Sequence, residues 1–314
     1  MGARATAFIT EADGFVGTEL IKVLVAGGHD VSGLVHSLEG AERVRRAGAT
    51  AVIGDLASPG PWQDEAQADW VFHLPPYPFG GGRITSQHAA FVMRTRVLTD
   101  TRLLDAVAAG TTRRIVYVSD ASYYGATGPR AITEDTPPQP SAWGRCLAPA
   151  LDRLEGYSLA GLPIVTAFPG WIYANASWFR RHVIQPVMSG GRVLHFGRIG
   201  PWVSPIHVED CARGLIHLAK HGEVGGRYFV VNTDPIRLYE FATTFARLAD
   251  RPLRCWSFPE SAARLLVGHI LAEHLRADAV FSNIRLRGIG FRFNYPTLER
   301  GLQQVLGALD ESSE

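Results

Sequence analysis

Cysteine and lysine are both scarce in this chain of 314 residues. The three cysteines, Cys146, Cys211 and Cys255, lie far apart and lack a C-x-x-C spacing, which excludes a disulfide framework or a structural zinc site. This pattern is typical of a reducing cytoplasm. The two lysines are Lys22 and Lys220, and arginine supplies the remaining fixed positive charge. Chemistry that needs an ammonium group therefore has only two residues to draw on.

Long apolar runs and a strong net charge are also missing. No run reaches the roughly 20 apolar residues needed to cross a bilayer, and the strand-like start argues against a signal peptide. The formal net charge of +1 argues against nucleic acid or an anionic membrane as a partner. No cluster of histidine, cysteine and acidic residues has metal-ligand spacing, so no metal is expected.

Strand-like and helix-like segments alternate through the first half of the chain. The strand-like segments are residues 5–10, 31–35, 51–53, 70–74, 114–119 and 163–168. Helical spacing occurs at residues 18–26, 89–109 and 142–159. This alternation predicts a parallel sheet covered on both faces. Later segments are expected as helices at 207–221, 238–248, 262–280 and after Thr297, with one strand at 227–232.

The first strand-like segment runs into a glycine turn, Thr10-Glu11-Ala12-Asp13-Gly14-Phe15-Val16-Gly17. A dinucleotide turn needs glycine because the backbone bends tightly and approaches the pyrophosphate closely. Gly14 and Gly17 stand where the last two glycines of a G-x-x-G-x-x-G turn stand, and Glu11 takes the place of the first. Because the turn follows a strand and opens a helix, it indicates a dinucleotide-binding sheet.

This turn and a series of later motifs resemble those of the extended short-chain dehydrogenases, the NAD(P)-dependent epimerase/dehydratase family. The later matches, in family order, are Gly54-Asp55-Leu56, Phe72-His73-Leu74, Val116-Tyr117-Val118-Ser119, Tyr124-Gly125, Thr133-Glu134-Asp135, Pro169-Gly170, Ile206-His207-Val208-Glu209-Asp210 and Tyr295-Pro296-Thr297. The resemblance implies an α/β fold, a Rossmann-type doubly wound parallel sheet with a smaller C-terminal substrate lobe. Residues 1–168 would form the dinucleotide-binding domain, to which 203–234 returns. Residues 169–202 and 235–314 would form the lobe.

The resemblance also implies a cofactor site at the ends of the first four strands. Its residues are Gly14, Phe15, Val16, Gly17, His36, Asp55, Leu56 and Leu74. Glu11 brings a carboxylate toward the pyrophosphate, and Pro75-Pro76 remove two backbone donors, so dinucleotide binding is left open. His36-Ser37 offers no acid to a ribose 2′-hydroxyl, so a bound dinucleotide would be NADP in preference to NAD.

The residues that perform the family's chemistry are replaced. In the family a Ser or Thr, a Tyr and a Lys act together, and the lysine lowers the pKa of the tyrosine that serves as acid or base. Asp120, Trp143 and Leu147 fall on those three positions. An indole offers no useful acid at neutral pH, and Lys22 and Lys220 lie on helices expected away from the cleft. Tyrosine-assisted hydride transfer is therefore not expected.

Asp120 is the main candidate for catalysis. It should project from the carboxyl end of a parallel strand, where ligands bind in such sheets, and could act there as a general acid or base. The alternative is a carboxylate that only caps a helix. Ser122 and Tyr123 on the same loop, with Trp143 opposite, complete the candidate catalytic set.

An aromatic cluster after residue 168 is the candidate substrate site. Trp171, Tyr173 and Trp178 would stack on a flat apolar ligand, or alternatively form the core of the lobe. The leading hypothesis is a non-redox proton-transfer enzyme of bacterial secondary metabolism. It would catalyse a cyclisation, dehydration, isomerisation or aldol-type step on an aromatic or polyketide-like small molecule. The alternatives are an NADP-dependent reductase or epimerase that works without the tyrosine, and a non-catalytic binding or regulatory protein. The resemblance further implies a homodimer through residues 89–109 and 142–159.

Overall fold

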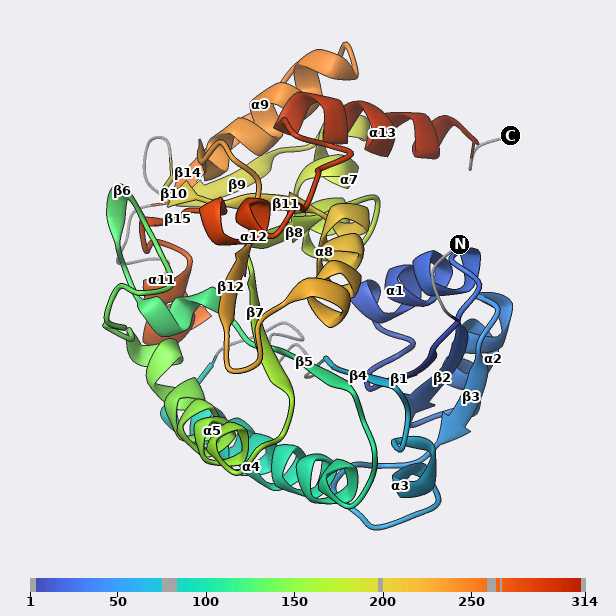
Figure 1. The fold of residues 1–314 in the computed structure, drawn as a ribbon. Helices are drawn as coiled ribbons and strands as arrows, with labels where there is room; N and C mark the ends of the chain where they lie inside the picture. The colour runs from blue at the N-terminus through green and yellow to red at the C-terminus, as the bar shows by residue number, and fades with distance from the viewer. Residues whose placement is uncertain (1–3, 75–83, 197–199, 259–263, 266, 312–314) are drawn as a thin grey trace.

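The computed structural model describes residues 4–74, 84–196, 200–258, 264–265 and 267–311. A seven-stranded parallel sheet forms its centre (Figure 1), with strand order β12-β7-β5-β4-β1-β2-β3. The strands are β1 Thr6–Ile9, β2 Asp30–Val35, β3 Thr50–Ile53, β4 Trp70–His73, β5 Arg114–Val118, β7 Ile164–Pro169 and β12 Arg227–Val230. This confirms the Rossmann-type sheet. The order reverses between β1 and β4, so ligands are expected at the carboxyl ends of these strands.

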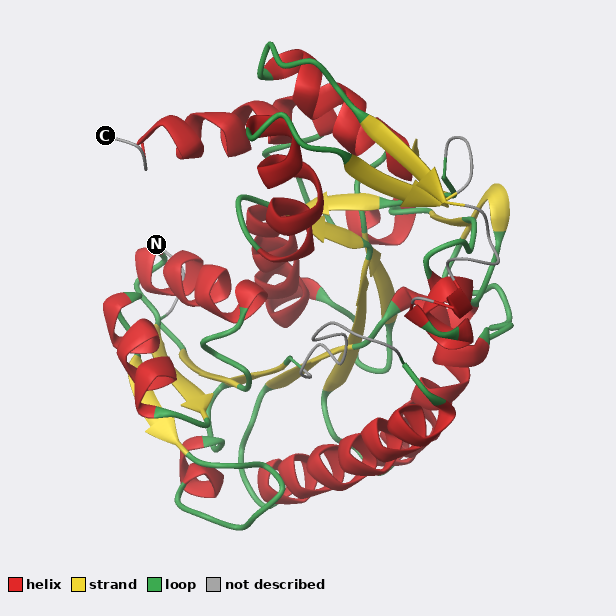
Figure 2. Cartoon of the chain, turned by 180° about the vertical axis from the view of Figure 1, so that it is seen from behind, coloured by secondary structure: helices red, strands yellow, loops and turns green. Residues whose placement is uncertain are grey.

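Helices cover both faces of the sheet (Figures 1 and 2). One face carries α1 Phe15–Ala26, α2 Leu38–Arg46 and α8 Val208–His221. The other carries α3 Trp62–Glu65, α4 Ser86–Ala108 and α5 Ala142–Leu159. Neighbouring residues of β1 face opposite ways, because Ile9 packs into the core under α1 and Phe8 into the core under α4. Each face thus has its own hydrophobic core.

A smaller lobe packs beyond the carboxyl ends of the strands. Its core is built on Tyr173, Phe179, Phe241, Phe245 and Leu302, all buried. The helical elements of the lobe are α6 Ser177–Phe179, the π-helical turn η2 Arg180–Ile184, α7 Gln185–Met188, α9 Leu238–Leu248 and α13 Leu298–Glu311. Its short strands are β9 Val193–Phe196, β10 Trp202–Val203, β13 Ile236–Arg237 and β14 Cys255–Phe258.

Further short elements connect the lobe to the sheet. They are the 3-10 helix η1 Ala121–Tyr124, β6 Gly128–Ile132, β8 Trp171–Tyr173, β11 Pro205–His207, α11 His269–His274, β15 Ala279–Phe281 and α12 Ile284–Gly288. Strand β11 pairs with β8, and β15 pairs with β6. None of the described helices is long and apolar enough to cross a membrane.

Two of the differences between the expected and the observed elements have a clear physical reason. Helix α2 was not expected, because its nine residues are mostly charged or small. The helix expected over 262–280 is interrupted: α11 spans only His269–His274, and Ala279–Phe281 is a strand. Gly268 before α11 has a φ of 82°, a conformation that breaks a helix. Thr297 accepts a hydrogen bond from the Arg300 N–H at 3.3 Å, which confirms it as a cap.

Helix α1 packs tightly against the backbone of the glycine turn at Gly17. A Cβ on Gly17 would lie 2.3 Å from the Glu11 carbonyl oxygen and 2.8 Å from that of Ala12. We expect Gly17→Ala to lower the free energy of unfolding in urea by about 1–3 kcal/mol, because backbone must shift. Gly156→Ala is the matched control, since Gly156 lies exposed within α5 with open space around it. It should raise stability by about 0.5–1 kcal/mol, and equal effects of the two changes would contradict this packing.

Candidate functional site

The dinucleotide turn lies between β1 and α1, and Gly14 is the N-cap residue of α1. Among the described residues no side chain caps this end of α1, and the first turn of the helix carries no acidic residue. The backbone N–H groups of Phe15 and Val16 therefore point toward the crevice from a helix N-terminus, the arrangement that binds phosphate. Gly17 packs against the turn as described above. This part of the site fits a pyrophosphate.

Glu11 has the left-handed backbone of the glycine it replaces, with a φ of 50°. Its carboxylate lies 3.4 Å from Nε2 of His36, which follows β2. Burial raises the pKa of the Glu11 carboxyl, although His36 acts in the opposite direction. The second acid of the turn, Asp13, forms an ion pair of 2.6 Å with Arg43 of α2. Each carboxylate of the turn therefore has a nitrogen-bearing partner from the segment after β2.

The remaining expected cofactor residues lie along the same crevice. Asp55 is exposed after β3, and its Oδ1 accepts the Ala57 N–H at 2.7 Å. Leu56 is buried beneath it. Leu74 at the end of β4 is held by Thr10, whose hydroxyl contacts both the Leu74 N–H and carbonyl oxygen at 2.9 and 3.0 Å. These residues follow β3 and β4 at the carboxyl ends of the strands, where ligands bind in such sheets. Pro75, Pro76 and the Gly80–Gly82 segment lie outside the described residues.

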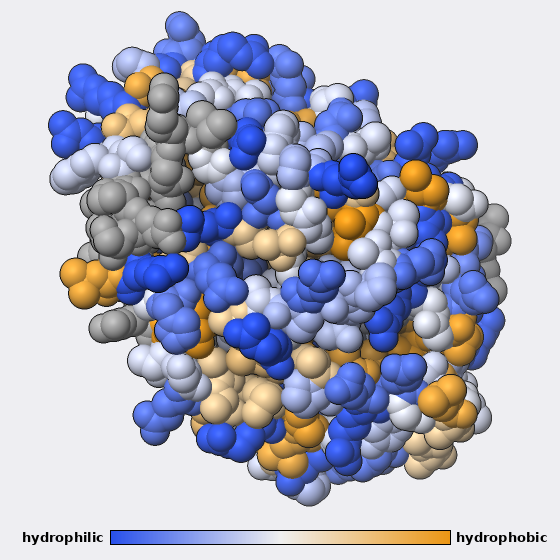
Figure 3. All heavy atoms as spheres, turned by 90° about the vertical axis from the view of Figure 1, so that its left-hand side faces the viewer, coloured by the Kyte–Doolittle hydropathy of each residue, from blue (hydrophilic) through white to orange (hydrophobic). Residues whose placement is uncertain are grey.

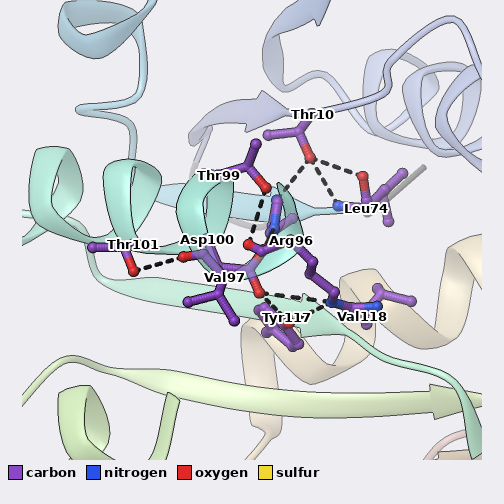
Figure 4. Close-up of polar contacts among 10 residues, drawn as sticks. Thr10, Leu74, Arg96, Val97, Thr99, Asp100, Thr101, Tyr117 and Val118 are labelled. Atoms are coloured by element: carbon purple, nitrogen blue, oxygen red, sulfur yellow. Dashed lines mark hydrogen bonds and ion pairs between the residues drawn. The ribbon is translucent and has the colours of Figure 1, made fainter. Parts of the chain in front are cut away.

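A chain of buried polar side chains runs beneath this crevice from β1 to β5 (Figure 4). The Thr10 hydroxyl lies 2.9 Å from His73 Nδ1, and His73 Nε2 lies 2.7 Å from Asp100 Oδ1. Tyr117 donates its hydroxyl to Asp100 Oδ2 at 2.5 Å. Arg96 donates its Nε–H to the Tyr117 oxygen at 2.9 Å. We call these five residues the buried network; they join β1, β4 and β5 to α4.

The charges of the buried network stabilise one another. Burial alone would raise the pKa of Asp100, but the hydrogen bond and charge of His73, with Arg96, hold it below its usual range. Burial opposes the charge of Arg96, yet Tyr117, Asp100 and Asp120 raise its pKa further above its ordinary value. Burial also raises the pKa of the Tyr117 phenol. Tyr117 is therefore a neutral structural donor, inaccessible to a substrate.

Asp120 lies half-buried where β5 ends, directly beyond the buried network. Its Oδ1 accepts the Ser122 N–H at 2.8 Å, so it does cap the 3-10 helix η1. Arg96 donates Nη2 to the Val118 carbonyl at 3.1 Å and lies close enough to Asp120 for their charges to interact. The capping role and a chemical role are thus compatible, because the cap uses one carboxylate oxygen.

Two serine hydroxyls flank Asp120. Ser119 Oγ and Ser122 Oγ are both buried and have no hydrogen-bond partner among the described residues. A buried hydroxyl without a partner is costly, about 1–3 kcal/mol, and is a natural place for a ligand to bind. Asp120, Ser122 and Arg96 therefore form the polar part of the candidate site. Arg96 was not in the candidate set drawn from the sequence.

Trp143 and Leu147 lie in the hydrophobic core under α5, and each is only 2 % exposed. The indole and the isobutyl group thus fill the core rather than line the crevice. Tyr123 also lies in this core, where its ring stacks on Phe168 at 6.3 Å. Tyr124 packs edge-on against Phe168 at 5.3 Å. Trp143 and Tyr123 are therefore buried, whereas Asp120 and Ser122 are only half-buried.

The aromatic cluster after β7 is divided between lobe core and surface. Tyr173 is fully buried, whereas Trp171 and Trp178 are half-buried with ring centroids 5.1 Å apart. Trp178 donates its indole N–H to the Ile172 carbonyl at 2.8 Å. His274 of α11 stacks over Trp171 at 6.2 Å. Of the three expected substrate-binding residues, two keep exposed surface and one is part of the core.

A cavity of about 340 Å³ lies beside α11 and the start of α5. It is lined by Ala126, Ser141, Arg264, His269, Glu273, Arg276 and Ala277. Glu273 accepts the Ala142 N–H at 3.2 Å and so caps α5. Hydrophilic residues cover most of this face, with small apolar patches between them (Figure 3). Within the described part of the chain, no three metal-ligating side chains come together.

Comparison with known proteins gives the family. The model of the NAD dependent epimerase/dehydratase family matches residues 7–232, and the chain belongs to this family. A ketoreductase of Stigmatella aurantiaca, named for a farnesylated dihydroquinoline oxide, is 26 % identical over 272 residues. That match covers 82 % of this chain and 77 % of the relative.

Solved structures of relatives share the fold. A mutant UDP-glucuronic acid 4-epimerase from Bacillus cereus, bound to NAD and a fluorinated UDP-sugar, superposes with a TM-score of 0.82 at 15 % identity. The match covers 98 % of this chain and 99 % of that one. The human epimerase family protein SDR39U1, solved with NADPH, gives 0.77 at 20 % identity, covering 96 % and 99 %. At these identities the likeness concerns the fold alone.

Substitution of Asp100 tests how much the buried network contributes to the stability of the fold. We expect Asp100→Asn to lower the free energy of unfolding by about 3–5 kcal/mol at neutral pH, because Arg96 would lose its buried carboxylate. A group with a lowered pKa stabilises the fold above its unfolded pKa, about 3.9, and loses that effect as pH falls through its folded pKa. The difference between wild type and variant, measured by urea denaturation, should therefore shrink in acid.

Asp105→Asn is the matched control for this measurement. Asp105 lies exposed on the same helix and accepts a hydrogen bond from Tyr157 at 2.5 Å. Asp105→Asn should lower the free energy of unfolding by about 1 kcal/mol or less. An Asp100→Asn effect no larger than this, or one that persists unchanged in acid, would contradict a charged carboxylate at the centre of the network.

Proposed function

We propose that the chain is an enzyme that binds a dinucleotide and moves a proton on a small aromatic or polyketide-like substrate, with Asp120 in place of the family's tyrosine. The observation that carries this is the burial of Trp143 and Leu147. Neither position offers a phenol or an ammonium, while Asp120 keeps access to the crevice. The proposed reaction class is a non-redox cyclisation, dehydration, isomerisation or aldol-type step. The place of such a step in bacterial secondary metabolism belongs to the same proposal.

The proposed proton transfer uses one free carboxylate oxygen. Oδ1 of Asp120 is engaged with the Ser122 N–H, which leaves Oδ2 to take a proton from an acidic carbon or hydroxyl of the substrate. The substrate then carries the negative charge as an enolate, close to the guanidinium of Arg96. Arginine keeps its proton, so Arg96 stabilises charge and Asp120 alone carries the proton. Return of that proton to another carbon completes an isomerisation. In a cyclisation or aldol-type step the enolate carbon first bonds to a carbonyl carbon, and the proton goes to the alkoxide that forms. In a dehydration the enolate expels a hydroxyl group, which takes the proton and leaves as water.

Two further features support this class of substrate. Trp171 and Trp178 present half-buried rings that suit a flat ligand. The cavity beside α11 carries Arg264, His269 and Arg276, which suit the acidic enol groups of polyketide-like molecules.

A reductase is the second candidate, because the ketoreductase of Stigmatella aurantiaca matches most of the chain. The residues named above would hold an NAD(P) dinucleotide: Gly14, Phe15, Val16 and Gly17 at the pyrophosphate, Asp55 and Leu56 at the adenine, and Leu74 at the end of β4. When bound, a nicotinamide supplies or accepts a hydride. The reductase differs from the leading proposal in consuming reduced dinucleotide in step with product.

Hydrogen exchange separates these functions. We expect the wild type to catalyse deuterium uptake at the acidic carbon of an aromatic 1,3-diketone in heavy water, measured by mass spectrometry without added dinucleotide. Asp120→Asn should slow this exchange by about 10²–10⁴-fold, the usual contribution of a general base. Asp152→Asn on the exposed side of α5 controls for the loss of one surface charge.

Each other outcome of these measurements favours a different function for the chain. Undiminished exchange in Asp120→Asn would remove Asp120 from the proposed role. Oxidation of NADH or NADPH that keeps pace with reduction of the diketone would favour the reductase. Dinucleotide binding without exchange or reduction of any tested ketone would favour a non-catalytic binding protein.

A further inference from the structure

The two carboxylates of the dinucleotide turn reach across to the corner between β2 and α2. Glu11 Oε1 approaches the imidazole of His36, the first residue after β2, and Asp13 Oδ2 approaches the guanidinium of Arg43 in α2. A Cβ on Gly40, in the first turn of α2, would lie 2.5 Å from the same Asp13 oxygen. Both acidic side chains therefore span the gap between the end of β1 and the end of β2.

In this architecture the adenosine ribose of a dinucleotide lies at the end of the second strand, where an acidic residue accepts its 2′-hydroxyl. The residues that follow β2 here are His36 and Ser37, and neither is acidic. The Glu11 side chain brings a carboxylate to the same place from the neighbouring turn, and it keeps 28 % of its surface exposed. A carboxylate is therefore present at the ribose position although the usual residue is missing.

The backbone of Glu11 gives independent support. The left-handed conformation at φ 50° costs a residue with a Cβ about 1 kcal/mol or more, and glycine would adopt it without that cost. Such strain is most often found where a side chain serves a ligand. Burial also raises the pKa of the Glu11 carboxyl, so this group gains from any ligand that donates hydrogen bonds to it.

The nitrogen-bearing side chains of this corner already have acidic partners. His36 faces Glu11, and Arg43 forms ion pairs with Asp13 and, at 2.7 Å, with Glu39. Three carboxylates thus surround one guanidinium and one imidazole, and the corner stays negative whether or not His36 is protonated. A 2′-phosphate would add about two negative charges to this corner, whereas a ribose hydroxyl would donate a hydrogen bond.

We propose that Glu11 is the ribose-binding residue of this chain and that it selects NAD over NADP. The proposal rests on the dinucleotide site of the proposed function, and it reverses the preference for NADP that the residues after β2 indicate on their own. Glu11 would accept the 2′-hydroxyl of the ribose and repel a phosphate at the same position.

Equilibrium binding of NADH and NADPH, followed by nicotinamide fluorescence, tests this without any turnover. We expect the wild type to bind NADH at least about tenfold more tightly than NADPH, since hydrogen bonds to a charged group contribute about 1.5–3 kcal/mol. Glu11→Gln keeps the size of the side chain and removes its charge. It should weaken NADH binding, strengthen NADPH binding and bring the ratio of the two dissociation constants close to one.

Glu42→Gln is the matched control, because Glu42 is an acidic residue of α2 that pairs with Arg45 and Arg46 on the exposed side. It should leave the ratio at the wild-type value. Tighter binding of NADPH than NADH by the wild type would overturn the proposal. So would a shift in Glu11→Gln no larger than that in Glu42→Gln.

The Glu11→Gly variant tests whether the Glu11 side chain blocks the dinucleotide site. If neither the wild type nor Glu11→Gly binds either dinucleotide, the proposed cofactor site is overturned together with Glu11's role. If only Glu11→Gly binds, Glu11 excludes the dinucleotide and its role as a ligand is overturned alone. Because these are binding measurements, failure of Asp120 in the exchange assay leaves their result unaffected.

Discussion

The charged carboxylate of Asp100 is the constraint on which the rest of the site depends. Taking a carboxylate out of water costs several kcal/mol unless it is paired and hydrogen-bonded. Asp100 meets this cost through His73, Tyr117 and Arg96, which come from β4, β5 and the preceding turn of α4. Through Thr10 the same network reaches β1. One buried charge therefore fixes the strand ends between which ligands bind in this architecture.

Under the proposed function, the buried network supplies the positive charge that the family takes from a lysine. In the family the charge comes from α5, on the turn of helix that follows the tyrosine. In this chain Trp143 and Leu147 fix α5 to the core, and Arg96 of α4 brings a guanidinium to the end of β5. A guanidinium stabilises negative charge but does not exchange protons. Under the proposed function, Asp120 and Arg96 therefore divide between them the two tasks of the family's tyrosine and lysine.

The fold could be predicted from the sequence because it depends on local patterns. Buried parallel strands are short apolar runs, and the helices between them repeat apolar residues at helical spacing, so each element can be recognised on its own. Helix α2 was missed because it presents little apolar surface. The strand Ala279–Phe281 was missed because its partner, β6, lies about 150 residues away along the chain. The cap at Thr297 was found because capping involves neighbouring residues.

The site could be predicted from the sequence only in part. The order of motifs placed Asp120 at the end of β5 and predicts that the family's tyrosine and lysine are replaced. The burial of Trp143 and Tyr123 depends on tertiary packing, which no local pattern could show. The buried network was missed because its members come from four elements. Its one local signal was Arg96 and Asp100, an opposite pair four residues apart within a helix that packs on the sheet.

A crystal structure of the chain with bound NADH would test most directly whether Asp120 and Arg96 replace the family's tyrosine and lysine. We expect Trp143 and Leu147 to remain in the core, with Asp120 and Arg96 as the ionisable side chains nearest the nicotinamide ring. A tyrosine hydroxyl and a lysine ammonium found together beside that ring would contradict this replacement, and would make the chain a conventional member of its family.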